Sequence, residues 1–324
     1  MNSVCKLELV TNEAVFTQLM ENEIHQMWQQ RIQGEFAGVD GIPIRWTSIT
    51  HSENRACIVV VNGRNETFWK YQELFYELSR QGFDIYALDH RGQGASGRLT
   101  PDSELGHVTN FDNYVMDLHT FVTDIVQLEN YQQRYLLAHS MGGAIATLYL
   151  ERFNPAFNAA VLNAPMFGIQ MPIMVKRVAA SLVKFIEQRQ TKPRYAMGQK
   201  PYVEMPFKQN DQSQSAVRYA WGNCLYQQHP ELRLGGVSSR WLWQAVEAAN
   251  HCVREADKIE VPVLLLQASS DTIVDNQAHY RFMAEAGQCE LKVIGEARHE
   301  LLMEKDAVRN QVLNETILFF SQHT

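Results

Sequence analysis

The chain has 324 residues, of which 45% are hydrophobic and 20% are charged, and its formal net charge is −7. This composition is that of a folded chain with a large core and argues against disorder, while the acidic balance disfavours nucleic acid as a partner. No apolar run approaches the roughly 18 residues of a membrane-spanning helix. The first 19 residues mix charged with apolar side chains and lack the continuous apolar stretch of a secretory signal.

The cysteine pattern is typical of a reducing compartment. The five cysteines are odd in number and none of them shows C-x-x-C spacing, which argues against a disulfide framework or a zinc site. We therefore expect a cytoplasmic protein, with no metal and no nucleic-acid partner.

Strand-like and helix-like runs alternate along most of the chain. Residues 34–50 have the Gly- and Pro-punctuated apolar pattern of an initial hairpin. Strands are then expected over 57–62, 84–89, 134–139, 159–164, 261–267 and 291–295, and helices over 68–80, 111–128, 141–152, 276–286 and 306–320. This alternation predicts an α/β fold with a mostly parallel, doubly wound sheet that is covered by helices on both faces.

The alternation is interrupted between residues 166 and 250. This stretch contains no clear strand, but it has a helix-like run over 173–188 and several prolines. It is also basic, because residues 170–240 carry 11 Lys or Arg against 4 Asp or Glu. We expect residues 166–250 to form an inserted, mainly helical cap on a core made of residues 1–165 and 251–324.

Ser140 stands where an apolar strand runs directly into a helix. A serine at so sharp a turn projects its hydroxyl from the sheet edge, beside the positive end of the new helix. The usual pattern is G-x-S-x-G, and Ala138 replaces the first glycine here. A serine that merely caps a helix before packing glycines would leave a similar pattern, so the rest of the chain must decide between the two interpretations.

A serine nucleophile needs a base, and the base needs an acid to orient it. Asp271 follows the strand over 261–267, and His299 follows the strand over 291–295, so both should reach the sheet edge that carries Ser140. Asp275 is a rival acid, but it stands directly before a helical run, where an Asp usually caps free N–H groups. His139 should point away from the Ser140 side chain, because strand residues alternate in direction.

The developing negative charge on a substrate carbonyl needs fixed donors, which form the oxyanion hole. One expected donor is the backbone N–H of Met141. The other should come from the turn Asn62-Gly-Arg-Asn65, and we assign it to the backbone N–H of Arg64. Many hydrolases carry His-Gly where this chain has Asn62-Gly63, and a plain strand-ending turn would also fit these residues. The turn over 89–96 lacks a full G-x-G-x-x-G, so it is assigned to the scaffold and predicts no nucleotide.

Several of these segments together resemble the monoacylglycerol lipase and lysophospholipase branch of the α/β-hydrolases. They are Asn62-Gly63, the turn over 89–96, His139-Ser-Met-Gly-Gly143, residues 264–271 and residues 295–299. Within that branch, the likeness is to a bacterial lysophospholipase associated with the inner membrane. The resemblance covers nearly the whole chain and is weakest in the cap.

The resemblance implies an α/β-hydrolase that cleaves the ester of a single-chain lipid, a lysophospholipid above all, to a fatty acid and a glycerophospho-alcohol without a cofactor. A monoacylglycerol lipase or general carboxylesterase is the main alternative. An aminopeptidase-like hydrolase and a non-catalytic binding protein on the same fold are more distant ones.

The basic cap suggests a peripheral contact with anionic membrane at the inner face of the cytoplasmic membrane. Lys176, Arg177 and Lys184 lie in a partly amphipathic run and could meet lipid phosphates. The competing interpretation is a helix that packs its apolar face on the body of the protein and leaves its lysines in solvent.

Overall fold

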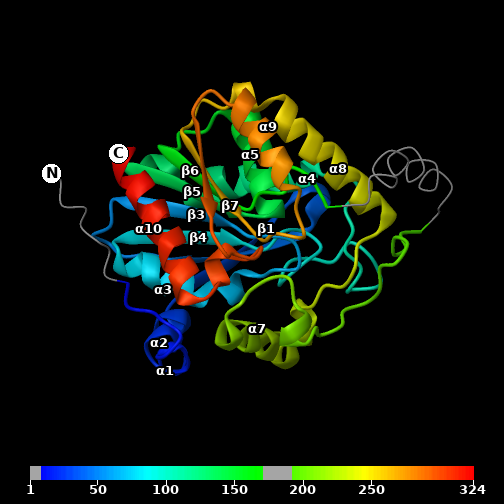
Figure 1. Ribbon diagram of the computed structural model, residues 1–324, viewed down its shortest axis with the longest axis horizontal. Coiled ribbons are helices and arrows are strands. Elements are labelled where there is room, and N and C mark those ends of the chain that lie inside the picture. The colour runs from blue at the N-terminus through cyan, green and yellow to red at the C-terminus, as the bar shows by residue number, and fades with distance from the viewer. Residues whose placement is uncertain (1–8, 171–191) are drawn as a thin grey trace.

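The computed structural model describes residues 9–170 and 192–324, and within them the strands form one eight-stranded sheet. The strand order is β1-β2-β4-β3-β5-β6-β7-β8 (Figure 1). β2 is antiparallel to both of its neighbours, and every other pair is parallel. The strands are β1 (Ile32–Ala37), β2 (Pro43–Ile49), β3 (Ala56–Val61), β4 (Phe83–Leu88), β5 (Gln133–His139), β6 (Ala159–Asn163), β7 (Val263–Ala268) and β8 (Cys289–Ile294).

Helices cover both faces of this sheet, as Figure 1 shows. The helices α4 (Asp112–Thr120), α5 (Met141–Phe153), α8 (Ser239–Arg254) and α9 (Asn276–Glu285) pack side by side on one face. The opposite face is covered by α3 (Gln72–Arg80) and α10 (Asp306–Gln322). The predicted doubly wound, mostly parallel sheet is therefore confirmed.

Two hydrophobic cores follow from the alternation of side chains along the strands. In β3, Cys57, Val59 and Val61 join the core under α4, α5, α8 and α9, whereas Ile58 and Val60 join the core under α3 and α10. Every residue of β3 is buried, because the strand has helices on both sides. This explains why its sequence is an uninterrupted apolar run.

Most predicted elements match the observed ones to within two residues. Two predicted helices are exceptions, because each of them is divided into two elements. The first turn of the predicted helix over 68–80 is a 3₁₀ turn (Phe68–Tyr71) that precedes α3. The predicted helix over 111–128 becomes α4 followed by a π-helical turn (Phe121–Val126). Residue 127 then adopts a left-handed conformation that ends the helix.

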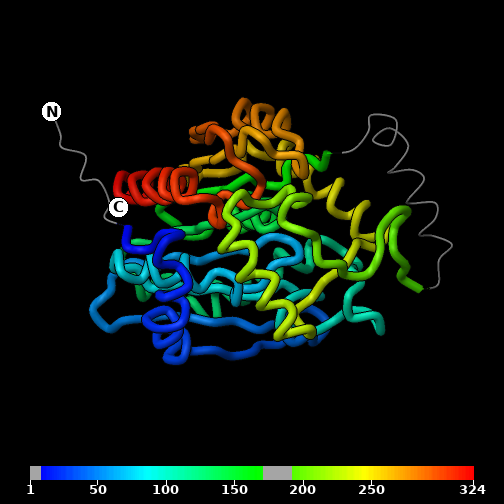
Figure 2. The backbone as a smooth tube through the Cα atoms, turned by 60° about the horizontal axis from the view of Figure 1, so that its bottom comes forward, coloured from blue at the N-terminus to red at the C-terminus, as the bar shows by residue number. Residues whose placement is uncertain are grey.

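Two N-terminal helices, α1 (Phe16–Glu21) and α2 (Glu23–Gln29), were not predicted. They lie beside α7 (Ala216–Gln228) at the bottom of Figure 1, and the rings of Phe16 and Trp221 meet edge to face at 6.3 Å. Figure 2 shows α7 and its flanking segments at the front of the molecule. The short N-terminal helices therefore support a segment of the expected cap.

The division into core and cap stays a prediction. The basic run over 173–188 lies outside the described residues. α8 crosses the expected boundary at residue 250, and it packs against α5 and α9.

Candidate active site

Ser140 occupies a strained turn between β5 and α5. Its φ of 53° and ψ of −119° are unusual for a residue with a side chain. Gly142 makes the turn possible, because a Cβ at that position would collide with the carbonyl oxygens of Val61 and Asn62. The glycine that packs α5 against the end of β3 thus fixes the geometry that presents the serine hydroxyl.

The structure brings Ser140, His299 and Asp271 together in one chain of hydrogen bonds. Nε2 of His299 lies 2.8 Å from Oγ of Ser140, and Nδ1 lies 2.7 Å from Oδ2 of Asp271. All three residues are buried. With the Nδ1 proton donated to the carboxylate, Nε2 is free to accept the proton of the serine hydroxyl.

The two candidate acids have different partners. Oδ1 of Asp271 accepts hydrogen bonds from the N–H groups of Ile273 and Val274, so this carboxylate is fixed on both sides. Burial alone would raise the pKa of Asp271, but the hydrogen bond and charge of His299 outweigh it and lower the pKa. Asp275 instead accepts from the N–H of Gln277 at the start of α9. This is the geometry of a helix cap.

The N–H groups of Met141 and Arg64 are the predicted donors of the oxyanion hole. Neither N–H donates a hydrogen bond to another group in the described part of the chain, and both residues adjoin the site, Arg64 as part of the pocket wall. Gln93 holds the turn that carries Arg64 by donating to the Gly63 carbonyl at 2.8 Å, and Tyr226 of α7 donates to the Asn65 carbonyl at 2.9 Å. The assignment of the two donors remains a proposal.

Asp89 binds both ends of the turn that carries Arg64, which agrees with a scaffold role for residues 89–96. Its carboxylate accepts hydrogen bonds from the Asn62 amide, the Thr67 hydroxyl and the Phe68 N–H. It also accepts from the N–H of Ala95. Burial raises the pKa of Asp89 to about 6 in spite of these bonds. Asn62, which departs from the usual His-Gly, thus ties the turn to the scaffold.

A buried carboxylate behind the site was missed by sequence reasoning. Oε2 of Glu66 accepts from the Gly63 N–H at 2.5 Å, the Tyr71 hydroxyl at 2.7 Å and Nδ1 of His139 at 3.1 Å. Nε2 of His139 lies 3.1 Å from the carbonyl oxygen of His299. The His139 ring lies 4.8 Å from the His299 ring, and His139 supports the main chain of His299.

The charges in this cluster stabilise each other. Burial opposes the charge on each group, yet His139 lowers the pKa of Glu66, and Glu66 raises the pKa of His139. Lys70 forms a second buried pair, with its Nζ 2.6 Å from Oε1 of Glu300. No sequence signal distinguishes Glu66 from an ordinary loop acid, because its partners come from distant segments.

The triad opens into a cavity of about 380 Å³. One part of its wall is apolar and is formed by Met166, Ile169, Val237, Leu242, Ile273 and Val274. The polar part includes Arg64, Gln170, Gln199 and Gln212. A cavity of this size with a few convergent polar groups fits a small amphiphilic substrate.

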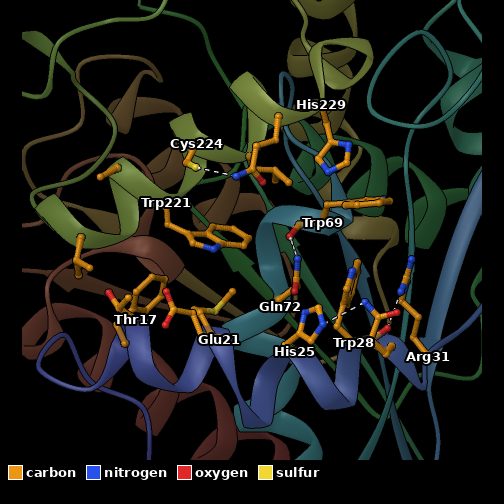
Figure 3. Close-up of a pocket in the computed structure, with 17 residues that line it drawn as sticks. Thr17, Glu21, His25, Trp28, Arg31, Trp69, Gln72, Trp221, Cys224 and His229 are labelled. Atoms are coloured by element: carbon orange, nitrogen blue, oxygen red, sulfur yellow. Dashed lines mark hydrogen bonds between the residues drawn. The ribbon is translucent and has the colours of Figure 1, made fainter.

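A larger groove, about 770 Å³ in volume, lies away from the triad between α1, α2 and α7. Figure 3 shows Trp28, Trp69 and Trp221 on its walls, with Arg31 beside Trp28. The Arg31 guanidinium stacks 4.3 Å from the centroid of the Trp28 ring. The groove holds no part of the hydrogen-bonded chain around Ser140, so its size does not make it the reaction site.

Across residues 9–170 and 192–324, no three His, Cys, Asp or Glu side chains are arranged to hold a metal ion. Within the same ranges, no helix has the length and apolar character needed to cross a membrane.

The sheet, the strained serine turn and the Ser140–His299–Asp271 hydrogen bonds define a serine hydrolase of the α/β-hydrolase fold. A family model described as serine aminopeptidase, S33, matches residues 52–306. The chain belongs to this family, and it is a serine ester hydrolase. The predicted resemblance to lysophospholipases and monoacylglycerol lipases is confirmed by its relatives.

Relatives and solved structures agree with this assignment. The chain is 38% identical to lysophospholipase L2 of Escherichia coli, over 97% of this chain and 94% of the relative. It is 28% identical to human monoglyceride lipase, over 83% and 84% of the two chains. The fold matches a monoglyceride lipase from Saccharomyces cerevisiae with a TM-score of 0.69 at 20% identity, covering 91% of this chain and 97% of that one. A carboxyl esterase from Bacillus coagulans matches with a TM-score of 0.72 at 16% identity, covering 90% and 98%.

Proposed function

We propose that this enzyme hydrolyses the single carboxylic ester of a lysophospholipid, with Ser140 as nucleophile, His299 as base and Asp271 as the acid that orients it. The observation that carries the proposal is the hydrogen-bonded chain of these side chains at the floor of a cavity with an apolar wall. The similarity to lysophospholipase L2 supports the substrate class.

In the first half of the reaction, Oγ of Ser140 attacks the acyl carbon while Nε2 of His299 takes the hydroxyl proton. The N–H groups of Met141 and Arg64 would stabilise the negative charge on the carbonyl oxygen. The C–O bond to glycerol then breaks, and His299 gives its proton to the departing glycerol oxygen. The products of this half are an acyl-enzyme and a glycerophospho-alcohol.

In the second half, water attacks the acyl carbon and gives its proton to His299. The ester bond to Ser140 breaks, the fatty acid leaves, and the serine regains its proton from His299. Asp271 stays ionised throughout and stabilises the imidazolium that forms twice in each cycle. None of these steps needs a metal or an organic cofactor.

A substrate panel tests the proposal. We expect faster hydrolysis of lysophosphatidylethanolamine and lysophosphatidylcholine than of a monoacylglycerol with the same chain, and little cleavage of an aminoacyl amide. Preference for the monoacylglycerol would favour the alternative that the monoglyceride lipase relatives support. Rapid cleavage of the amide would favour an aminopeptidase, as the family description suggests.

We also propose that the enzyme meets anionic membrane at the cytoplasmic face, through the segment over 192–208. Its apolar side chains Met197, Val203, Met205 and Phe207 are exposed, and so are Lys192, Arg194, Lys200 and Lys208. Exposed apolar groups among basic ones favour an anionic lipid surface. Vesicle co-sedimentation should increase with anionic lipid and decrease with salt. Reversing the charges at Lys200 and Lys208 should weaken it, and binding indifferent to these changes would contradict the proposal.

A further inference from the structure

The side chain of Arg64 lines the cavity that contains Ser140, and its charge has no acidic partner among residues 9–170 and 192–324. Nη1 donates to the carbonyl oxygen of Gly235 at 2.9 Å, and the guanidinium lies 5.5 Å from the centroid of the Trp241 ring. In the described part of the chain, no other group accepts a hydrogen bond from Arg64 and no carboxylate forms an ion pair with it. Several of its N–H groups therefore remain available.

Two fully buried arginines of this protein are paired with carboxylates. Arg91 lies 2.6 Å from Asp117, and Arg218 lies 2.7 Å from Glu73. Burial lowers the pKa of Arg64 to about 10, which still leaves its guanidinium charged at neutral pH. A partly buried cation without an acid is costly to keep. Its position in the cavity wall points to a negative charge that arrives with the substrate.

The acidic residues that line the cavity are already paired. Glu66 is bound by His139, and Glu300 is bound by Lys70. Among the described residues that line this cavity, Arg64 is a cation that forms no ion pair, so an anionic substrate group would be drawn to its guanidinium.

We propose that the Arg64 guanidinium binds the phosphate of the lysophospholipid and makes the enzyme prefer this substrate to a monoacylglycerol; the inference rests on the proposed function. Arg64 alone would then bind both the ester carbonyl and the phosphate of the substrate. Its N–H would face the carbonyl oxygen, and its side chain would extend toward the phosphate, which lies beyond the three carbons of glycerol. A planar guanidinium can bind two phosphate oxygens at once.

A monoacylglycerol lacks the phosphate, so it leaves the guanidinium without a counter-charge in the occupied cavity. The discrimination therefore comes from the charge and not from the apolar wall, which an equal acyl chain would contact equally. The alcohol attached to the phosphate makes no difference to this contact. We expect lysophosphatidylethanolamine and lysophosphatidylcholine to depend on Arg64 to the same degree.

The test compares kcat/KM for lysophosphatidylethanolamine and for a monoacylglycerol with the same chain, in the same neutral detergent micelles. In Arg64→Met, the ratio of the two values should fall about 10- to 100-fold, the effect expected for losing hydrogen bonds to a charged group. A disturbance of the oxyanion turn slows both substrates and cancels in the ratio. Arg64→Lys keeps a point charge without the fork and should retain part of the preference.

Arg98→Met is the matched control. Arg98 also donates to main-chain carbonyls, those of Glu231 and Arg233, but it does not line the cavity. The ratio of the two kcat/KM values in Arg98→Met should therefore stay at the wild-type value. An unchanged ratio in Arg64→Met, or equal shifts in the two Met variants, would overturn the assignment and leave the proposed function standing. If Arg64→Met does not fold, a wild-type ratio in Arg64→Lys would overturn it instead. A wild-type enzyme that hydrolyses no lysophospholipid would overturn the proposed function itself.

Discussion

Replacing Glu66 by Gln should destabilise the protein far more than a surface carboxylate would. The Glu66 carboxylate is 3% exposed and accepts three hydrogen bonds, one of them from His139. Removing one partner of a buried ion pair typically costs about 3–5 kcal/mol of unfolding free energy. We expect a loss of this size for Glu66→Gln, because the amide removes the negative charge that pairs with His139.

The effect should depend on pH with a definite sign. The pKa of His139 is raised above its usual value in the folded protein, against the effect of burial, by Glu66. The stability from this pair is therefore fully present below the ordinary histidine pKa of about 6.5, and it is lost as pH rises through the raised value. The difference between wild type and Glu66→Gln should shrink accordingly between about pH 6 and about pH 9.

Urea unfolding at these two pH values measures the difference. The control is Glu35→Gln, which removes a carboxylate 3.0 Å from Arg45 in a pair whose side chains are 42% and 52% exposed. Such surface pairs contribute about 0–1 kcal/mol. Equal losses in the two variants, or a Glu66→Gln loss that grows with pH, would refute the role of Glu66 as the partner of a charged His139.

Three further predictions concern the site. Ser140→Ala should lower kcat by about 10⁴- to 10⁶-fold with an unchanged thermal melt, measured with a p-nitrophenyl ester, and near-wild-type turnover would contradict the nucleophile assignment. Asp271→Asn should lose activity at unchanged stability. Asp275→Ala should instead lose about 0.5–2 kcal/mol of stability and keep its activity. The reverse pattern would mean that Asp275 is the catalytic acid and Asp271 the helix cap. Gly142→Ala should lower both the melting temperature and kcat, because its Cβ meets the main chain of Val61 and Asn62, and a fully active variant would show that the turn tolerates displacement.

The sequence by itself was enough to predict the order of strands and helices and the three residues of the hydrogen-bonded chain. Parallel strands end at one edge of a sheet, so residues that directly follow β5, β7 and β8 must come together there. A second rule separated Asp271 from Asp275. A carboxylate directly before a helix usually caps the free N–H groups of its first turn, as Asp275 does. These conclusions depend on short-range patterns that a single sequence contains.

Only the tertiary structure could reveal the groups that surround those residues. Glu66, His139 and the carbonyl of His299 are joined across three segments that lie far apart in the sequence. Nothing in the sequence shows that the Arg64 side chain lines the cavity and forms no ion pair with a described carboxylate. The N-terminal helices were missed for a related reason, since six- and seven-residue helices owe their stability to packing against α7 and α3 and not to their own sequence. Burial and pairing of charges are properties of the packed molecule, because they depend on which distant segments meet.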